Sequence, residues 1–528
     1  MKNLLFCALL VSGCANAQTN NQSTETDSTA LPTDSIKTEI AEKYQRLPDT
    51  QFVSVENFEY EIKIFDTVHN GEIDNLKPRY DNTSNILTFR KNSFRNADFG
   101  GKVTGTPKNI TVEWTFETDM DNTDTKYGRW GGGTGWTGQP LYVNWSDSLK
   151  EKFKSTASAN VTQNFNNQEI MIGSLASKVY FIDYETGKKS RTPLEVNNPI
   201  KGTISLDPNL NGKLYVGQGV PARLPYGQLT ADLFTQTVKN TNMADSKAWR
   251  GWHASDSSPL RIGQFVFRPS ENGTLYKFYV TDSIEILHSQ MKYRKKGSSG
   301  PGMESSMSVY MNYGFVADNH GYIVCVNLDC LKPVWIYNNH DDTDATPVIE
   351  VEDGTPYIYI GCEMDRQGDL GQSHFAKINA LTGEKIWDYA ESAKKVKTGS
   401  KHFDGGYYAT ALLGHGDCDS LVFVNYVAND NGQNGYFYAF NKKDGTLKYK
   451  TKLNCYSWSS PVGFLNETDE MFVFSGDTRG YVYLFKGQTG EILCSKLLGI
   501  NFESSPAVID NHVVIGSRGN KIYKLKIE

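Results

Sequence analysis

Charged and aromatic residues recur at one position of a repeated motif, immediately before a short Ser/Thr-Pro strand start. Clear copies of the motif are Ser257-Ser258-Pro259, Ala345-Thr346-Pro347, Ser459-Ser460-Pro461 and Ser504-Ser505-Pro506. The preceding residues are Lys201, Asp256, Glu304, Asp344, Tyr408, Trp458 and Glu503, with Trp136 or Thr137 in the first copy. Carboxylates gathered at one axis repel one another, so they should bind a cation, recruit Lys201 or share a proton. Alternatively, they cap the inner strands in a wet channel, or they bind a polar ligand.

Tryptophans beside glycines form a second group. Trp130 and Trp136 flank a run of three glycines, and Trp252 stands shortly before Asp256. Exposed Trp beside Gly suits flat ligands such as sugar or quinone rings, or a partner peptide. The alternative is packing between structural units. The glycine run lacks the Lys-Ser/Thr ending of a phosphate-binding loop, so nucleotide binding is unsupported.

Other motifs of catalysis or metal binding do not appear. Six cysteines, at 325, 330, 362, 418, 455 and 494, are scattered without any Cys-x-x-Cys pair. Five histidines, at 320, 340, 374, 402 and 415, show no metal-ligand spacing and are expected to be isolated loop residues. There is no Gly-x-Ser-x-Gly elbow. The sequence therefore assigns no catalytic residue and no metal ligand.

The elements that would position these side chains come from an internal repeat. A strand ending in Asp or Asn is followed by Gly four residues later, as in Asn379 to Gly383. Asp or Asn closes such a turn, and Gly takes its positive-φ position. A bulky residue four positions further on, such as Trp335 or Trp387, should pack on the neighbouring unit. Eight units of four antiparallel strands predict an all-β, eight-bladed β-propeller, whereas a β-solenoid usually has shorter repeats.

The two ends of the repeat region should meet. The last unit ends at Glu528 without an outer strand, and an unpaired strand with Trp114 runs from 111 to 116. This strand should supply the outermost strand of the last blade and close the ring. The pattern is weak over 205–300, and residues 218–255 are interpreted as an insertion that carries specificity and could be deleted without loss of folding.

The repeat resembles that of quinoprotein propellers, in the Pro-Val strand start, the Tyr-x-x-Asn/Asp strand and the Thr-Gly-Glu-x-x-Trp turn. This family includes the pyrroloquinoline quinone (PQQ) dehydrogenases and the BamB-like lipoproteins of the outer-membrane assembly machine. The resemblance covers about 110–528 and implies the PQQ-like fold. The adjacent cysteine pair of the PQQ alcohol dehydrogenases is absent, as is a Cys-x-x-Cys-His haem motif.

The N-terminus predicts export. Residues 1–17 have a basic start and an apolar run too short to span a bilayer. Val11-Ser12-Gly13-Cys14 resembles a bacterial lipobox, with cleavage before Cys14 and acylation of that residue. Alternatively, cleavage after Ala17 would give a soluble periplasmic or secreted protein. Residues 18–50, rich in Ser and Thr, are predicted to be a flexible tether, and 51–528 the propeller.

Composition limits the partners. The chain of 528 residues has a net charge of −6, which gives no electrostatic basis for nucleic-acid binding. We expect an outer-membrane lipoprotein, on the periplasmic or surface face, that acts as a non-enzymatic scaffold for an envelope protein or a small polar ligand. It would touch the membrane through its lipid anchor only and need no cofactor. The alternatives are a PQQ- and calcium-dependent oxidoreductase, with Asp256, Glu304 or Asp344 as metal ligand or base, and a carbohydrate-binding lipoprotein that uses Trp136 and Trp252.

Overall fold

The repeat units form consecutive antiparallel sheets. The computed structural model describes residues 44–49, 57–77, 80, 84–156, 166–243, 245–398 and 401–528. Cys14 and residues 18–43 of the predicted tether lie outside the described residues. The described part is almost entirely strand and loop, with a helix α2 (Asp147–Ser155) and a 3₁₀ turn η1 (Gly416–Cys418). Neither is long or apolar enough to cross a membrane.

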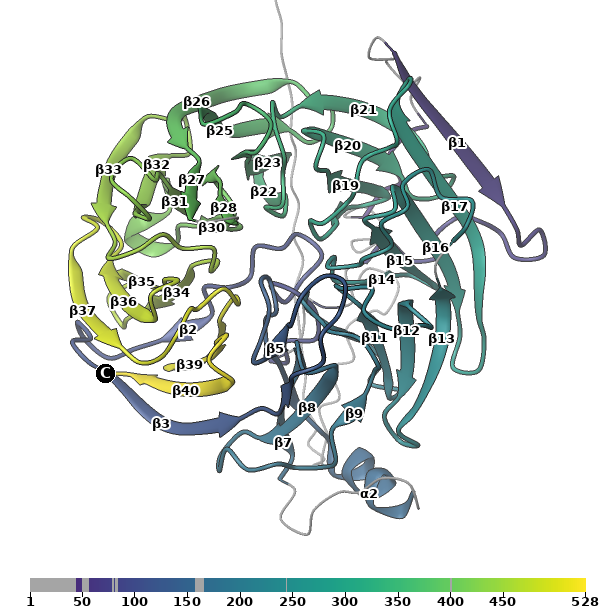
Figure 1. Cartoon of the computed structure of the whole chain (residues 1–528), viewed down its shortest axis with the longest axis horizontal. Helices are drawn as coiled ribbons and strands as arrows, with labels where there is room; N and C mark the ends of the chain where they lie inside the picture. The colour runs from purple at the N-terminus through teal and green to yellow at the C-terminus, as the bar shows by residue number, and fades with distance from the viewer. Residues whose placement is uncertain are drawn as a thin grey trace, which may run out of the picture. The chain divides into compact units, whose positions relative to one another are not determined.

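Eight blades of four antiparallel strands follow one another around a ring in chain order (Figure 1), which confirms the predicted fold. Blades 1 to 4 consist of β6 (Leu141–Asn144), β7 (Gln168–Ser174), β8 (Lys178–Asp183) and β9 (Leu194–Glu195); β10 (Ser205–Leu206), β11 (Lys213–Gly217), β12 (Gly227–Asp232) and β13 (Thr237–Met243); β14 (Leu260–Ile262), β15 (Phe265–Ser270), β16 (Thr274–Val280) and β17 (Glu285–Lys295); and β18 (Ser308–Tyr310), β19 (Tyr313–Ala317), β20 (Tyr322–Asn327) and β21 (Lys332–Asn338).

Blades 5 to 8 repeat this order, and the last of them takes its fourth strand from the N-terminal side. They consist of β22 (Val348–Glu352), β23 (Thr355–Gly361), β25 (Leu370–Asn379) and β26 (Lys385–Lys394); β30 (Leu412–Leu413), β31 (Leu421–Val427), β32 (Gly435–Asn441) and β33 (Leu447–Lys452); β34 (Val462–Leu465), β35 (Met471–Gly476), β36 (Tyr481–Lys486) and β37 (Ile492–Leu497); and β38 (Ala507–Ile509), β39 (His512–Gly516), β40 (Lys521–Ile527) and β3 (Ile110–Glu117).

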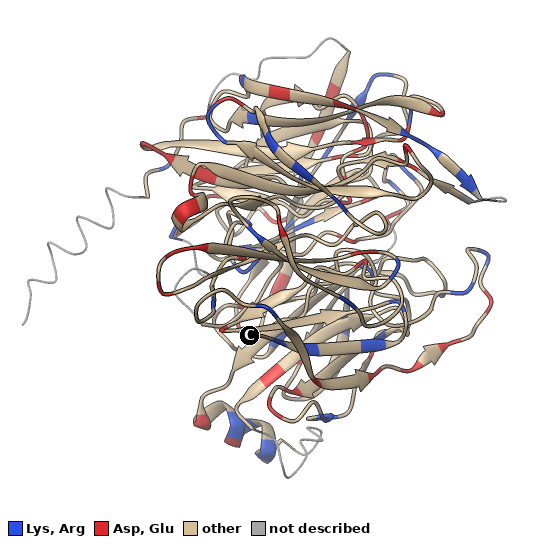
Figure 2. Ribbon diagram, turned by 90° about the vertical axis from the view of Figure 1, so that its left-hand side faces the viewer, with Lys and Arg blue, Asp and Glu red and all other residues tan. Residues whose placement is uncertain are grey.

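Short strands supplement the blades. β1 (Phe58–Ile64) adds a fifth strand to blade 3, and β2 (Gly101–Lys102) pairs in parallel with β34. The remaining short pairs are β4 (Met120–Asp121) with β5 (Gly131–Gly132), β24 (Glu363–Met364) with β29 (Gly405–Gly406), and β27 (Val396–Thr398) with β28 (Lys401–Phe403). Figure 2 shows acidic and basic residues interspersed over the blades.

A tryptophan on the outer strand of one blade packs on the Gly turn of the next, as predicted. The Trp335 indole N–H donates to the Ala380 carbonyl at 3.0 Å. Gly383 has φ +74°, and a Cβ there would lie 2.7 Å from the Trp335 ring, so both the backbone and the contact require Gly. Trp387 likewise donates to the Lys442 carbonyl of blade 6.

The strand before the repeats occupies the predicted position in blade 8. β3 pairs antiparallel with β40 along its length and is the outermost strand of that sheet. Its Trp114 donates to the Tyr184 carbonyl of blade 1 at 2.9 Å. Trp114 thus makes the same contact between blades that Trp335 makes between blades 4 and 5.

The interpretation of 218–255 as an insertion is wrong. This range contains β12 and β13, which pair with each other and complete blade 2. The range departs from the repeat pattern because it contains two long connections, one between β11 and β12 and one between β13 and β14. Deleting it would remove two strands of a blade and expose β11, so it should not spare folding.

Residues 86–102, here called the floor segment, touch every blade and had no sequence signature. Backbone groups pair with the innermost strands: Ile86 with Tyr142, Leu87 with Leu206, Ser93 with Val309, Phe94 with Ile349, Asp98 with Gly463 and Lys102 with Asp510. The fully buried Arg90 and Arg95 donate to the carbonyls of Ala411, Pro461, Met307 and Ser258. Because it bonds to all eight blades, the segment fixes their inner edges to one another.

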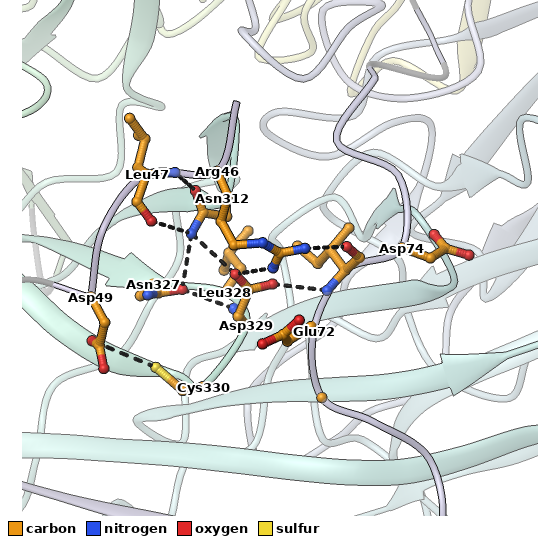
Figure 3. Close-up of polar contacts among 12 residues, drawn as sticks. Arg46, Leu47, Asp49, Glu72, Asp74, Asn312, Asn327, Leu328, Asp329 and Cys330 are labelled. Atoms are coloured by element: carbon orange, nitrogen blue, oxygen red, sulfur yellow. Dashed lines mark hydrogen bonds and ion pairs between the residues drawn. The ribbon is translucent and has the colours of Figure 1, made fainter. Parts of the chain in front are cut away.

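A second N-terminal piece contacts residues in the turns of blade 4 (Figure 3). Asp329 pairs with Arg46 at 2.5 Å and accepts a hydrogen bond from the Ile73 N–H at 2.8 Å. Asn312 exchanges hydrogen bonds with both backbone groups of Leu47. Residues 46–49 and 57–77, here called the strap, are held to the propeller by these contacts.

Candidate functional site at the channel ring

The Ser/Thr-Pro motif forms a chain of hydrogen bonds around the axis. The N–H groups of Ser258, Ser306, Thr346 and Thr410 donate, in that order, to the hydroxyls of Ser306, Thr346, Thr410 and Ser460, at 2.9 to 3.1 Å. Each hydroxyl therefore joins one blade to the next. Because these bonds fix the start of each innermost strand, the residue just before the motif is held near the centre of the ring of blades.

On one side of the channel, Lys201 forms an ion pair with Asp256. Asp256, Glu271 and Glu304 each offer an oxygen within 4.8 Å of the others. Glu271 accepts a hydrogen bond from the Trp252 indole N–H at 2.7 Å. The structure thus brings together Lys201, Asp256, Glu304 and Trp252, which the sequence singled out, and adds Glu271.

A second carboxylate group lies around Asp344. Asp342, Asp344 and Glu363 offer oxygens within 4.8 Å of one another, and Tyr408 lies next to Glu363. Glu271 and Glu363, which sequence reasoning missed, both follow the second strand of a blade. In an antiparallel blade, that strand ends where the first begins. A carboxylate just after a predicted second strand was therefore the available signal.

Aromatic rings line the next part of the ring. Trp136 lies 5.9 Å from Tyr408 and 5.8 Å from Trp458 between centroids, and Tyr408 lies 5.2 Å from Trp458. The Lys201 ammonium is 5.8 Å from the Trp136 centroid. Glu503 is already engaged, because it accepts from the Asn501 amide at 2.6 Å and lies 3.8 Å from Arg518.

Burial and mutual repulsion make the ring carboxyls weak acids. Burial raises the pKa of Asp256 to about 6; Lys201 opposes this effect and Glu304 adds to it. Burial and then neighbouring carboxyls raise the pKa of Glu271, Asp344 and Glu363 well above the usual range. Burial would lower the pKa of Lys201, but Asp256, Glu271 and Glu304 raise it.

Several buried polar atoms of the ring have no hydrogen-bond partner among the described residues. They are Asp256 Oδ1, Glu271 Oε1, Asp342 Oδ1 and Glu363 Oε1, together with the indole nitrogens of Trp136 and Trp458. Asp256, Glu271 and Glu363 are more than nine-tenths buried. A buried acceptor without a donor costs about 1–3 kcal/mol, and more when charged. A cation or N–H donor in the channel would offset this cost.

The ring residues differ in how well they fit a calcium ion and how well they fit PQQ. Hard divalent cations take carboxylate oxygens, and each group of three carboxylates offers them, so the residues fit such an ion. PQQ is itself a tricarboxylate, and Lys201 is already paired with Asp256. The ring therefore fits PQQ only if a cation bound at the carboxylates compensates the negative charge of the ring and the negative charge of PQQ.

Two features lie away from the ring. A cleft of about 510 Å³ opens where the strap passes β17, but its Arg46 is paired with Asp329 and its His69 with Asp66. The expectation that the histidines are isolated loop residues is wrong for His340 and His374, whose rings stack at 3.7 Å. His374 lies within β25, and a strand position was not recognised from its spacing. The six cysteines at 325–494 are free thiols.

Comparisons with known proteins bear on the fold of the chain. No family model and no curated protein matches the chain in sequence. Among solved structures, the europium-containing methanol dehydrogenase gives a TM-score of 0.57 at 12% identity, over 85% of this chain and 99% of that one.

A second dehydrogenase structure shows the same likeness. The quinohemoprotein alcohol dehydrogenase of Comamonas testosteroni gives a TM-score of 0.57 at 12% identity, over 86% of this chain and 82% of that one. BamB from Moraxella catarrhalis gives 0.48 at 13%, over 79% and 100%. At these identities the comparisons show the fold, and function must be argued from the site.

Proposed function

We propose that the protein is a non-enzymatic binding scaffold of the bacterial cell envelope, tethered through acylated Cys14, whose channel ring binds a cationic group. The observation that carries the proposal is the set of buried carboxylate oxygens without donors at Asp256, Glu271 and Glu363. Such oxygens are stabilised by a positive charge brought from outside.

The ring chemistry defines the class of ligand. Carboxylates supply charge and hydrogen-bond acceptors, while the faces of Trp136, Tyr408 and Trp458 attract cations through their π-electrons. A divalent ion, a small ammonium compound or a Lys or Arg side chain of an envelope protein shares this chemistry. The partner is therefore a small polar cation or a basic segment of a protein.

The test is direct binding to the full chain in detergent. Calcium, and separately a small diamine such as putrescine, would be titrated calorimetrically at pH 7.5 into wild type, Glu363→Gln and Glu503→Gln. We expect Glu363→Gln to weaken binding at least about tenfold, because it removes a direct ligand. Glu503→Gln is the matched control, since Glu503 is already paired with Asn501. Equal binding by all three proteins would refute the assignment of the ring.

A quinoprotein oxidoreductase is the second candidate, favoured by the fit of the carboxylate groups to a divalent cation. Bound PQQ would supply two-electron oxidation, while Lys201 and the ring carboxylates would hold and orient it with the ion. Native mass spectrometry with PQQ, with and without calcium, separates the two candidates. A one-to-one quinone adduct that requires calcium would favour the oxidoreductase; no adduct would favour the scaffold.

A further inference from the structure

A group of two histidines and one aspartate lies outside the channel ring, where blade 4 meets blade 5. His340 is in the loop after β21, His374 is in β25 and Asp388 is in β26. The imidazole rings stack with centroids 3.7 Å apart and planes 13° apart. His374 Nδ1 lies 2.9 Å from Asp388 Oδ1, and His340 Nε2 lies 3.6 Å from Asp388 Oδ2.

The local fold explains why these side chains meet. In the β25–β26 hairpin, His374 is opposite Ala390 and Asp388 is opposite Ala376, so His374 and Asp388 are diagonal neighbours on one face. His340 has φ +74°, a conformation that residues other than Gly seldom adopt. The loop therefore holds a strained residue whose ring lies on that of His374.

The residue types of the group suit a metal ligand set. Imidazole nitrogens and a carboxylate oxygen are donors that zinc takes in proteins. The competing cation is Lys385, whose ammonium lies 3.3 Å from Asp388 Oδ2.

We propose that His340, His374 and Asp388 bind one divalent transition-metal ion, with zinc the natural occupant, and thereby join blade 4 to blade 5. One ligand atom from each residue lies within 4.8 Å of the others. Zinc bonds of about 2.0–2.2 Å require the three atoms to draw closer and to point at one centre. The His340 side chain, 38% exposed, can swing out of the stack to do so, and water fills the fourth position.

The ligand types distinguish this site from the channel ring. Two imidazole nitrogens and one oxygen favour zinc, copper or nickel, whereas the all-carboxylate groups of the ring favour calcium or magnesium. Bound copper would therefore show nitrogen coupling at the histidine site. Copper bound at the ring carboxylates would show no coupling to histidine nitrogen.

The experiment uses the full chain freed of metal by chelation. Zinc would be titrated calorimetrically, and one equivalent of copper examined by electron paramagnetic resonance, in wild type, His340→Ala, His374→Gln and Asp344→Asn. We expect one zinc ion per chain, at least about tenfold weaker in either histidine variant and unchanged in Asp344→Asn. The copper spectrum of wild type should show two nitrogen ligands, and that of each variant one at most.

His512→Ala is the matched control, because His512 Nε2 lies 3.2 Å from Glu113 in a pair with a single imidazole. It should leave both measurements unchanged. His340→Ala alters an exposed loop side chain, so folding is preserved and a lost signal reports on the ligand. Absence of zinc binding, or zinc binding of wild-type strength in His340→Ala, would overturn the proposal.

Discussion

Replacement of Asp256 by Asn tests whether the channel ring contains uncompensated negative charge. Burial, first, and then Glu304 raise the pKa of Asp256 to about 6 from 3.8, in spite of Lys201. The side chain is only 5% exposed, so solvent screening is small. This rise in the pKa, from 3.8 to about 6, corresponds to a loss of about 3 kcal/mol of unfolding free energy when Asp256 ionises. The folded protein binds this proton more tightly than the unfolded chain, so its stabilising effect is complete below pH 3.8 and is lost as pH rises through about 6.

The assay is urea unfolding at pH values from 4 to 8 in the presence of a chelator. The quantity of interest is the difference in unfolding free energy between wild type and Asp256→Asn. Wild type should lose about 3 kcal/mol relative to the variant over this range, because only wild type has the Asp256 carboxyl to ionise there. The variant also loses the pair with Lys201, which displaces the whole curve without supplying this slope, because Glu271 and Glu304 still raise the pKa of Lys201.

A control and a refuting result complete this test. Asp124→Asn removes one exposed carboxylate, paired with Arg129, and should show no comparable slope relative to wild type. Adding calcium at pH 8 should restore part of the lost stability of wild type, because a bound cation lowers the carboxyl pKa values. A difference between wild type and Asp256→Asn that stays constant from pH 4 to 8 would refute the electrostatic argument for the ring.

Three further substitutions test the elements that hold the ring, each by urea unfolding at pH 7. Arg90→Met should lower the unfolding free energy by about 3–5 kcal/mol because Asp98 stays buried and unpaired, and adding Asp98→Asn should recover part of the loss; no recovery would contradict the pairing. Thr346→Val removes the hydroxyl that accepts from the buried Ser306 N–H and should lower the unfolding free energy by about 1–3 kcal/mol. An unchanged unfolding free energy would show that these hydroxyl hydrogen bonds do not stabilise the contact between blades. Gly383→Ala places a Cβ 2.7 Å from Trp335 at φ +74° and should cost more than about 1 kcal/mol; wild-type stability would contradict the packing of blade 4 on blade 5.

The blade repeat could be predicted from the sequence because each blade carries its own local signals. The Asn379–Gly383 turn is fixed by the positive φ of Gly383, and Trp387, four residues later, is fixed by its hydrogen bond to Lys442 of the next blade. Blade 2 was missed over 218–255 because Gln236, at φ +53°, takes the place of Gly in the turn that follows Asp232, although the strands pair in the same way. The floor segment could not be predicted, since its bonds are made by backbone groups and by two arginines to carbonyls of distant strands.

Part of the channel ring could be predicted because some of its residues stand next to a local sequence motif. Lys201, Asp256, Glu304 and Asp344 precede a recognisable motif, and the structure places each of them with partners at the channel. Glu271 and Glu363 depend on where a second strand ends, which is set by pairing rather than by the residues themselves. The meeting of His340 with His374 depends on a loop conformation with positive φ at a non-glycine residue, for which the sequence offered no signal.

The floor segment bears on what the ring can bind, because it brings two buried positive charges to the inner ends of the blades. Arg90 and Arg95 direct their N–H groups to backbone carbonyls, and Arg90 lies 3.2 Å from Asp98. Burial lowers the pKa of both arginines; Asp98 opposes this effect at Arg90, and Tyr80 and then Asp98 oppose it at Arg95. Their charge is thus used to join the blades, and among the described ring residues Lys201 alone forms an ion pair with Asp256. Glu503 lies 3.8 Å from Arg518, whereas Glu271, Asp342, Asp344 and Glu363 have no ion-pair partner among the described residues. These four carboxylates can gain a counter-charge by taking up protons or by binding a cation, which is why pH and cation should act on this protein in opposite directions at the same site.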